Sequence, residues 1–167
     1  MLSWEPITLS LRALFYFDLV RLYGMPYNYS KSALGVPLVL NTLAADAQPH
    51  RATVEEVYKQ IISDLTEGQK LMASDKSVHN GYLDYYGNVA LQARVKLYME
   101  AYAGALAAAR EVIASGQYKL YAPDQWAASW SRQYGTESIF ELGIDTETDL
   151  GTTSLGFYYM RAEQKRN

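Results

Sequence analysis

Large aromatic side chains near the C-terminus are the residues of this chain whose chemistry is easiest to assign. Trp126 and Trp130 stand four residues apart, and Tyr158 and Tyr159 are adjacent. Flat aromatic faces stack on the apolar faces of pyranose rings, and a few polar groups at the edge of such a site orient the ligand. We therefore take these four residues as candidate ligand-binding residues, with an oligosaccharide as the ligand.

The same aromatic residues also fit a structural role. Trp126, Trp130 and Tyr134 recur every four residues, which places them on one side of a short helix. Large aromatic side chains are more often packed against a core than held in solvent. Of the two adjacent tyrosines, we expect one to be buried and one exposed. The exposure of the tryptophans in the folded chain distinguishes the two interpretations.

No arrangement typical of catalysis occurs in the sequence. His50 and His79 each lie in a polar segment without a second histidine at helical spacing, so we assign both to the surface. The motifs of α/β-hydrolases, zinc proteases and phosphate-binding loops are absent. We therefore expect a protein that is not an enzyme, has no catalytic residue and needs no cofactor.

One acidic cluster, Asp145, Glu147 and Asp149, alternates along the chain. A glycosidase needs two carboxyl groups that flank the scissile bond, one of them with a raised pKa, and an open loop offers no burial to raise it. The spacing also matches the start of an EF-hand loop, but Leu150 stands where that loop requires glycine. We interpret the cluster as a solvated loop and expect no metal site.

Composition restricts the possible partners. The chain has 167 residues, 49% of them hydrophobic, a net charge of −3 and no basic run, which indicates one folded domain over residues 1–167 and no nucleic-acid partner. No apolar stretch is long enough to span a bilayer, and the first residues lack the basic start of a signal peptide. There is no cysteine, which excludes disulfides, thiolate chemistry and a lipid-modified cysteine within this sequence.

The elements that must position these residues are helices. Between Gly87 and Leu120, small and large apolar residues alternate at spacings of three and four, which predicts a hairpin of helices at 88–101 and 102–115. Ala93, Ala105 and Ala109 would allow the two helices to approach closely. Gly116 would end the second helix in the left-handed conformation. The order of small and aromatic positions is typical of a tetratricopeptide hairpin.

Two further helices are predicted near residues 6–23 and 53–72. Thr53 and Glu56 form a capping box at the start of the second, and Gly68 weakens that helix by up to about 1 kcal/mol relative to alanine. The connection between them contains an extended stretch at residues 36–40. We expect residues 121–167 to be irregular, with 138–144 as the best strand candidate. The predicted fold is mostly all-α, with tetratricopeptide-like hairpins and an irregular, aromatic-rich C-terminal part.

Four ordered segments resemble the SusD/RagB family of surface glycan-binding lipoproteins. They are RALFYFDLVRLYG at 12–24, RATVEEVYKQIISDL at 51–65, the hairpin that starts with ALQARVKLYM at 90–99, and ESIFEL at 137–142. The family usually has Gly-Asp between the two hairpin helices, where this chain has Glu100 and Ala101. Known members are much longer, so the chain resembles the central, tetratricopeptide-like part of one.

The resemblance implies a non-enzymatic component of polysaccharide utilisation at the surface of the outer membrane. Such a protein binds an oligosaccharide and passes it to a TonB-dependent, SusC-like transporter for nutrient uptake. In this family the glycan site is built mostly by segments before and after the helical repeats. The alternative is a helical-repeat module for protein–protein interaction with no ligand of its own. Because repeats need neighbours to cover their apolar faces, we also expect self-association through an apolar, tyrosine-rich face.

Overall fold

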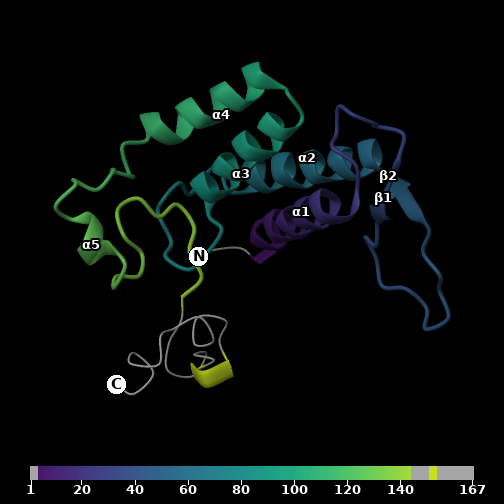
Figure 1. The fold of residues 1–167 in the computed structure, drawn as a ribbon, viewed down its shortest axis with the longest axis horizontal. Helices are drawn as coiled ribbons and strands as arrows, with labels where there is room; N and C mark the ends of the chain where they lie inside the picture. The colour runs from purple at the N-terminus through teal and green to yellow at the C-terminus, as the bar shows by residue number, and fades with distance from the viewer. Residues whose placement is uncertain (1–3, 144–150, 154–167) are drawn as a thin grey trace.

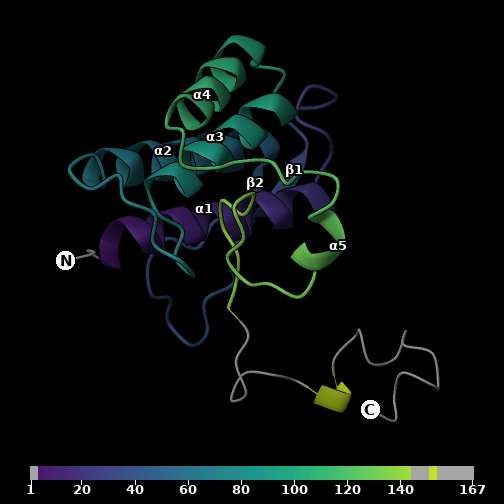
Figure 2. The ribbon, with the colours of Figure 1, turned by 90° about the vertical axis from the view of Figure 1, so that its left-hand side faces the viewer.

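A computed structural model describes residues 4–143 and 151–153 of the chain. Its body consists of helices α1 (Trp4–Tyr23), α2 (Val54–Leu71), α3 (Tyr85–Tyr98) and α4 (Tyr102–Ala114). Each helix packs against the next, so that α4 lies on the side of α3 away from α1 (Figures 1 and 2). The short helix α5 (Trp126–Ser129) and the 3₁₀ turn η1 (Gly151–Thr153) follow. The predicted mostly helical fold with helical hairpins is therefore confirmed.

The ends of the helices are determined by local side-chain chemistry. At the start of α2, the Glu56 N–H donates to the Thr53 hydroxyl at 3.2 Å and the Thr53 N–H donates to the Glu56 carboxylate at 2.8 Å, which is the predicted capping box. The hydrogen bond from the Thr53 backbone lowers the pKa of Glu56. The helix α3 begins earlier than predicted, because the buried Asp84 carboxylate accepts from the Gly87 N–H at 3.0 Å.

The long connection between α1 and α2 contains two short strands. Strand β1 (Leu34–Pro37) pairs in antiparallel orientation with β2 (Arg51–Thr53), so the extended stretch predicted for residues 36–40 begins earlier and is shorter than expected. The Arg51 guanidinium donates to the carbonyls of Gly35, Leu34 and Tyr23 at 2.6, 2.9 and 3.0 Å. These bonds anchor the strand pair to the end of α1, at the end of the molecule opposite to α5 (Figure 1).

The strand predicted for residues 138–144 is wrong over its described part, residues 138–143, which form no strand. Ile139 and Phe140 are half-buried there and pack against the helices. A β-ladder requires a neighbouring strand with free backbone groups, and within the described residues none lies beside this segment. The apolar pattern therefore reflects attachment to the helices.

Two apolar clusters hold the helices together. The larger one joins α1, α2 and α3 and includes the fully buried Phe17, Ile61, Leu65 and Val95. The smaller one joins α3 and α4 through Tyr86, Val89, Ala108 and Val112, among others. Ala105 is buried as the hairpin prediction requires, whereas Ala93 and Ala109 are half-buried and Ala108 supplies the second closely packed alanine of α4. The two clusters make α3 the central helix of the body.

The turn between α3 and α4 holds Glu100 in the left-handed conformation, with φ at 58°. Its N–H donates to the Leu97 carbonyl at 3.0 Å, which fixes the turn. A residue with a Cβ atom is disfavoured in this region by about 1–2 kcal/mol, and glycine avoids this cost. Glycine also increases the entropy of the unfolded chain, which offsets part of the gain. The net result expected for Glu100→Gly is therefore stabilisation by roughly 0.5–1 kcal/mol.

Urea denaturation of Glu100→Gly measures this effect, with Glu100→Ala as the matched control. Alanine removes the carboxylate but retains the Cβ atom that causes the strain, so it should give no comparable gain. A denaturation midpoint of Glu100→Gly at or below that of the unmodified chain would show that the turn stores no strain.

Candidate functional site

The two tryptophans that the sequence singled out lie together on the surface. Trp126 begins α5 and Trp130 follows its last residue, and their ring centroids are 5.8 Å apart with an interplanar angle of 86°. Trp126 is 53% exposed and Trp130 is 78% exposed, and neither belongs to an apolar core cluster of the described residues. The interpretation that the two tryptophans pack against the helical core is therefore wrong. The interpretation that their aromatic faces are exposed and open to a ligand is the one that remains.

The chain that leaves α4 carries α5 away from the helical body. Gly116 adopts a left-handed φ of 67° directly after α4, which redirects the backbone as predicted. Tyr118 then packs edge-on against Tyr86 with a centroid distance of 6.4 Å, and burial raises the pKa of Tyr118 to about 12. The Lys119 N–H donates to the Thr136 carbonyl at 2.9 Å. This bond joins the outgoing segment to the segment that returns after α5.

Between these two segments lies a shallow cavity of about 370 Å³, which we call the α5 cavity. It combines the two indole rings with hydroxyl, carboxylate and guanidinium groups. Its lining residues are Tyr121, Trp126, Ser129, Trp130, Arg132, Gly135, Glu137, Ser138 and Glu141. Flat apolar faces surrounded by hydrogen-bonding groups are the composition that suits binding of a polyhydroxylated ligand.

Two carboxylates of the α5 cavity are held in place by backbone donors. Glu137 accepts a short hydrogen bond from the Tyr121 N–H, and Glu141 accepts from the Tyr134 N–H at 3.0 Å through Oε2. Each bond occupies one oxygen of its carboxylate. Within the described residues, the second oxygen of each has no hydrogen-bond partner in the protein. These oxygens can accept hydrogen bonds from a ligand.

None of the other residues considered in the sequence lines the α5 cavity in the part of the chain that the structure describes. Tyr158 and Tyr159 lie outside the described residues, as do the acidic residues Asp145, Glu147 and Asp149. His50 is exposed in the connection before β2. The His79 N–H donates to Asp84 at 2.9 Å, and its ring lies 3.3 Å from the Asp75 carboxylate, so this histidine stabilises the loop before α3. No cluster of three metal-ligating side chains occurs among residues 4–143 and 151–153.

Apart from the two tryptophans, the polar and aromatic residues that line the α5 cavity were not predicted from the sequence. Glu141 lies in the segment interpreted as a strand and Glu137 directly before it, and nothing in the pattern there points to a ligand. Arg132 and Ser138 are ordinary surface residue types, and Tyr121 precedes α5 without a recognisable motif. Only the return of residues 135–141 alongside residues 119–121 places them beside the tryptophans. No sequence signal within a short window could have identified them.

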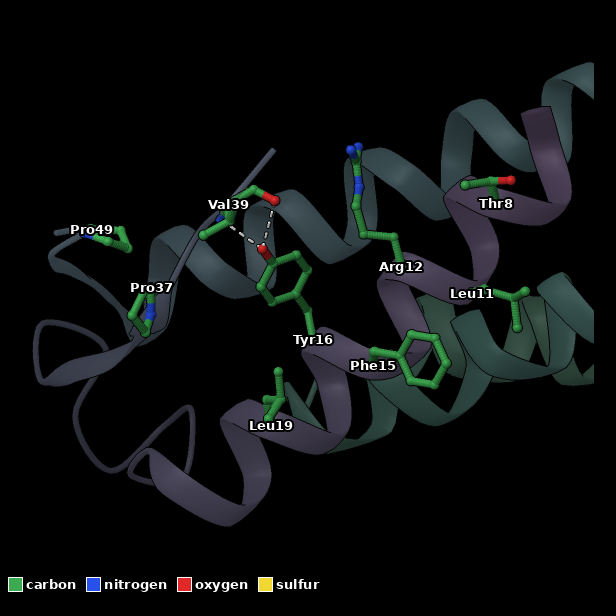
Figure 3. Close-up of a pocket in the computed structure, with 9 residues that line it drawn as sticks. All are labelled: Thr8, Leu11, Arg12, Phe15, Tyr16, Leu19, Pro37, Val39 and Pro49. Carbon is green, nitrogen blue, oxygen red and sulfur yellow. Dashed lines mark hydrogen bonds between the residues drawn. The ribbon is translucent and has the colours of Figure 1, made fainter. Parts of the chain in front are cut away.

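A second and larger cavity, the α1 groove, has a different chemistry. It has a volume of about 630 Å³ and is lined by Thr8, Leu11, Arg12, Phe15, Tyr16 and Leu19 of α1 and by Pro37, Val39 and Pro49 of the following connection. Figure 3 shows the connection held across the groove by Tyr16, whose hydroxyl bonds to the N–H and the carbonyl of Val39 at 2.7 and 3.0 Å. Because few polar groups line it, this groove suits an apolar partner rather than a sugar.

None of the helices described here has the length and apolar character needed to cross a lipid bilayer. The longest described helix, α1, carries charged residues and contributes a buried face to the core.

Comparison with known proteins finds relatives that are SusD-like. A SusD-like family, described as starch-binding and associating with the outer membrane, matches residues 7–98. The chain is 28% identical over 162 residues to the SusD-like protein P38 of Formosa agariphila, an alignment that covers 89% of this chain and 30% of that protein.

Solved structures show the same similarity. A SusD superfamily protein from Bacteroides thetaiotaomicron is 36% identical with a TM-score of 0.78, over 86% of this chain and 31% of the other. A laminarin-binding SusD-like protein is 27% identical with a TM-score of 0.64, over 81% of this chain and 29% of the other. The chain thus spans about a third of the length of these relatives.

Proposed function

Because this chain belongs to the SusD-like family, we propose that it binds an oligosaccharide in the α5 cavity without acting on it chemically. The observation that carries the proposal is the exposed pair Trp126 and Trp130 beside hydroxyl, carboxylate and guanidinium groups. The laminarin-binding relative supports a glycan as the class of ligand. Tyr158 and Tyr159 stay in the proposal as further aromatic contacts.

The geometry of the two indoles defines how a sugar would be held. Their planes meet at 86°, so one pyranose ring can stack on one indole while its edge contacts the other. Hydroxyl groups of the sugar would donate to the free oxygens of Glu137 and Glu141 and accept from Arg132. Charge-assisted hydrogen bonds of this kind are roughly twice as strong as neutral ones. The site would therefore bind by stacking and hydrogen bonding.

For the whole protein, we propose a role in nutrient uptake at the outer membrane. The protein would capture oligosaccharides at the cell surface as a lipoprotein and pass them to a TonB-dependent, SusC-like transporter. The description of the family as starch-binding and associated with the outer membrane supports this location. The transporter is proposed as the partner on the basis of the family alone.

Removal of either indole of the α5 cavity is expected to weaken glycan binding by at least about tenfold, because a stacking face is lost. The variants are Trp126→Ala and Trp130→Ala. The measurement is calorimetric titration with laminarin-type and starch-type oligosaccharides. The matched control is Trp4→Ala, since Trp4 is 70% exposed on α1, packs edge-on against Tyr82 and does not line the cavity. Equal affinity of Trp130→Ala and the unmodified chain would place the site elsewhere.

The α1 groove favours a second candidate function, protein–protein interaction by a helical-repeat module. Phe15 and Leu19 are exposed along it, and the groove is open in the monomer. Contiguous apolar patches beyond several hundred Å² are rare on stable monomers and commonly mark interaction sites. This observation also motivates the expectation that the chain self-associates.

Sedimentation velocity at micromolar concentration tests self-association through the α1 groove. We expect dimers or larger species whose population falls in Phe15→Ser, because the serine removes apolar surface from the lining of the groove. Leu106→Ser is the matched control, since Leu106 is an exposed apolar residue on α4 that does not line the groove. A monomer at all concentrations, or equal effects of the two variants, would contradict association through this face.

A further inference from the structure

The charges of the α5 cavity are unevenly distributed. In the part of the chain that the structure describes, its lining contains one guanidinium, that of Arg132, against the two carboxylates of Glu137 and Glu141. The whole chain is also acidic, with a net charge of −3. A ligand that enters the cavity therefore meets a local excess of negative charge.

The two carboxylates cannot easily move away from a ligand. Glu137 is bound to the Tyr121 N–H and Glu141 to the Tyr134 N–H, so rotation out of the cavity would sacrifice a charge-assisted hydrogen bond. A flexible surface carboxylate can turn into solvent when an anion approaches, whereas these two keep their charge in place. Like charges held close together across an interface are strongly unfavourable.

The same arrangement favours sugars that carry only hydroxyl groups. A hydroxyl donates a hydrogen bond to a carboxylate oxygen, and Glu137 and Glu141 each have one oxygen to which no donor of the described residues bonds. The single guanidinium of Arg132 can donate to ring or hydroxyl oxygens of a neutral sugar. Among the described lining residues, Arg132 carries the positive charge that would attract an anion, so it opposes selection against acidic glycans.

We infer, on the basis of the proposed function, that the α5 cavity selects uncharged oligosaccharides over glycans that carry carboxylate or sulfate groups. The feature that excludes the acidic glycans is the pair of carboxylates fixed by backbone donors. Arg132 orients the neutral ligand but does not reverse the selection.

A matched panel of ligands tests this selection on the unmodified chain. Glucan, galactan and mannan oligosaccharides are each paired with the counterpart in which the primary alcohol at C6 has been oxidised to a carboxylate. Titration calorimetry is performed at low and at high salt. At low salt, every neutral oligosaccharide that binds should do so at least about tenfold more tightly than its oxidised partner. High salt should narrow this ratio by screening the repulsion.

The carboxylates are then neutralised in Glu137→Gln/Glu141→Gln, which preserves their size and an oxygen that can accept from the backbone. In this variant, the ratio of the affinity for the neutral ligand to the affinity for its oxidised partner should approach one. Glu67→Gln is the control, because Glu67 is an exposed carboxylate of α2 outside the cavity and its removal should leave the ratio unchanged. Thermal melting establishes that the double variant is folded. The salt dependence of the unmodified chain tests the role of the two carboxylate charges independently of any variant.

Three results would overturn the inference. Equal or tighter binding of the oxidised members would refute the selection while leaving the proposed glycan binding intact. A tenfold ratio that persists in the double variant and at high salt would show that the carboxylates do not cause it. Absence of binding for every member of the panel would refute the proposed function and this inference together.

Discussion

Arg12→Met is expected to destabilise the fold by about 3 kcal/mol, because it leaves the Asp64 carboxylate buried without its cation. Arg12 of α1 donates to both oxygens of Asp64 on α2, from Nε and from a terminal nitrogen, at 2.7 Å each. The Asp64 side chain is only 3% exposed, whereas that of Arg12 is 32% exposed. The hydrogen bond to Asp64 raises the pKa of Arg12, as expected for a cation stabilised by its partner.

The loss should be moderated by Gln60, whose amide donates to Asp64 at 2.7 Å and still satisfies one oxygen in the variant. Urea denaturation measures the change. Lys59→Met is the matched control, because the ion pair of Lys59 with Glu55 lies on the surface and should contribute less than about 1 kcal/mol. The double variant Arg12→Met/Asp64→Leu should recover much of the stability, since no buried charge remains. A loss below 1 kcal/mol in Arg12→Met would show that Asp64 does not depend on its partner.

Gly68→Ala is expected to destabilise the protein by about 2 kcal/mol, although alanine is the better helix former. Gly68 lies in α2 beside residues of both α1 and α3. A Cβ atom at this position would meet the Ser10 hydroxyl at 2.9 Å and the Asn88 amide nitrogen and the Pro6 carbonyl oxygen at 3.1 Å each. These groups are joined to one another, since Asn88 donates to Ser10 at 2.7 Å and Ser10 donates to Pro6 at 2.8 Å. The added methyl group would therefore disturb a buried hydrogen-bond network that links three helices.

Gly104→Ala is the matched control for this experiment. Gly104 lies inside α4, and the nearest atoms to an added Cβ belong to the flexible side chain of Lys96, at 3.2 Å and beyond. Here the helix propensity of alanine should dominate, and the variant should gain up to about 1 kcal/mol. Opposite signs of the two changes in urea denaturation would support the close approach at Gly68. A gain in stability for Gly68→Ala would contradict it.

The helices of this fold were predictable because short-range interactions determine them. The capping box at Thr53, the terminator at Gly116 and the apolar spacing of α3 and α4 all involve residues within four positions of one another. The segments that resemble the SusD/RagB family are of this kind as well, and the family assignment follows from them. Errors appeared where a boundary depends on a specific cap, as at Asp84, or where a pattern required a distant partner, as for residues 138–143.

The candidate site was only half predictable from the sequence. The spacing of Trp126, Trp130 and Tyr134 predicted a short helix with all three on one side. The two tryptophan rings do lie together, but α5 ends at Ser129 and Tyr134 lies beyond the helix. Whether that side faces the core or the solvent depends on where the chain goes after Gly116, and no local pattern contains this information. The carboxylates of the site reach it from a segment about ten residues further along, through hydrogen bonds to Tyr121 and Tyr134.

The sequence by itself determined the helical class, the hairpin and the family, because these depend on residue types at fixed short spacings. Tertiary structure alone decided that the tryptophans are exposed, that Glu137 and Glu141 line their cavity, and that Gly68 marks a contact rather than a weak point. The physical reason is the same in each case. The environment of these side chains is created by segments that are distant in the chain and adjacent only in the folded molecule.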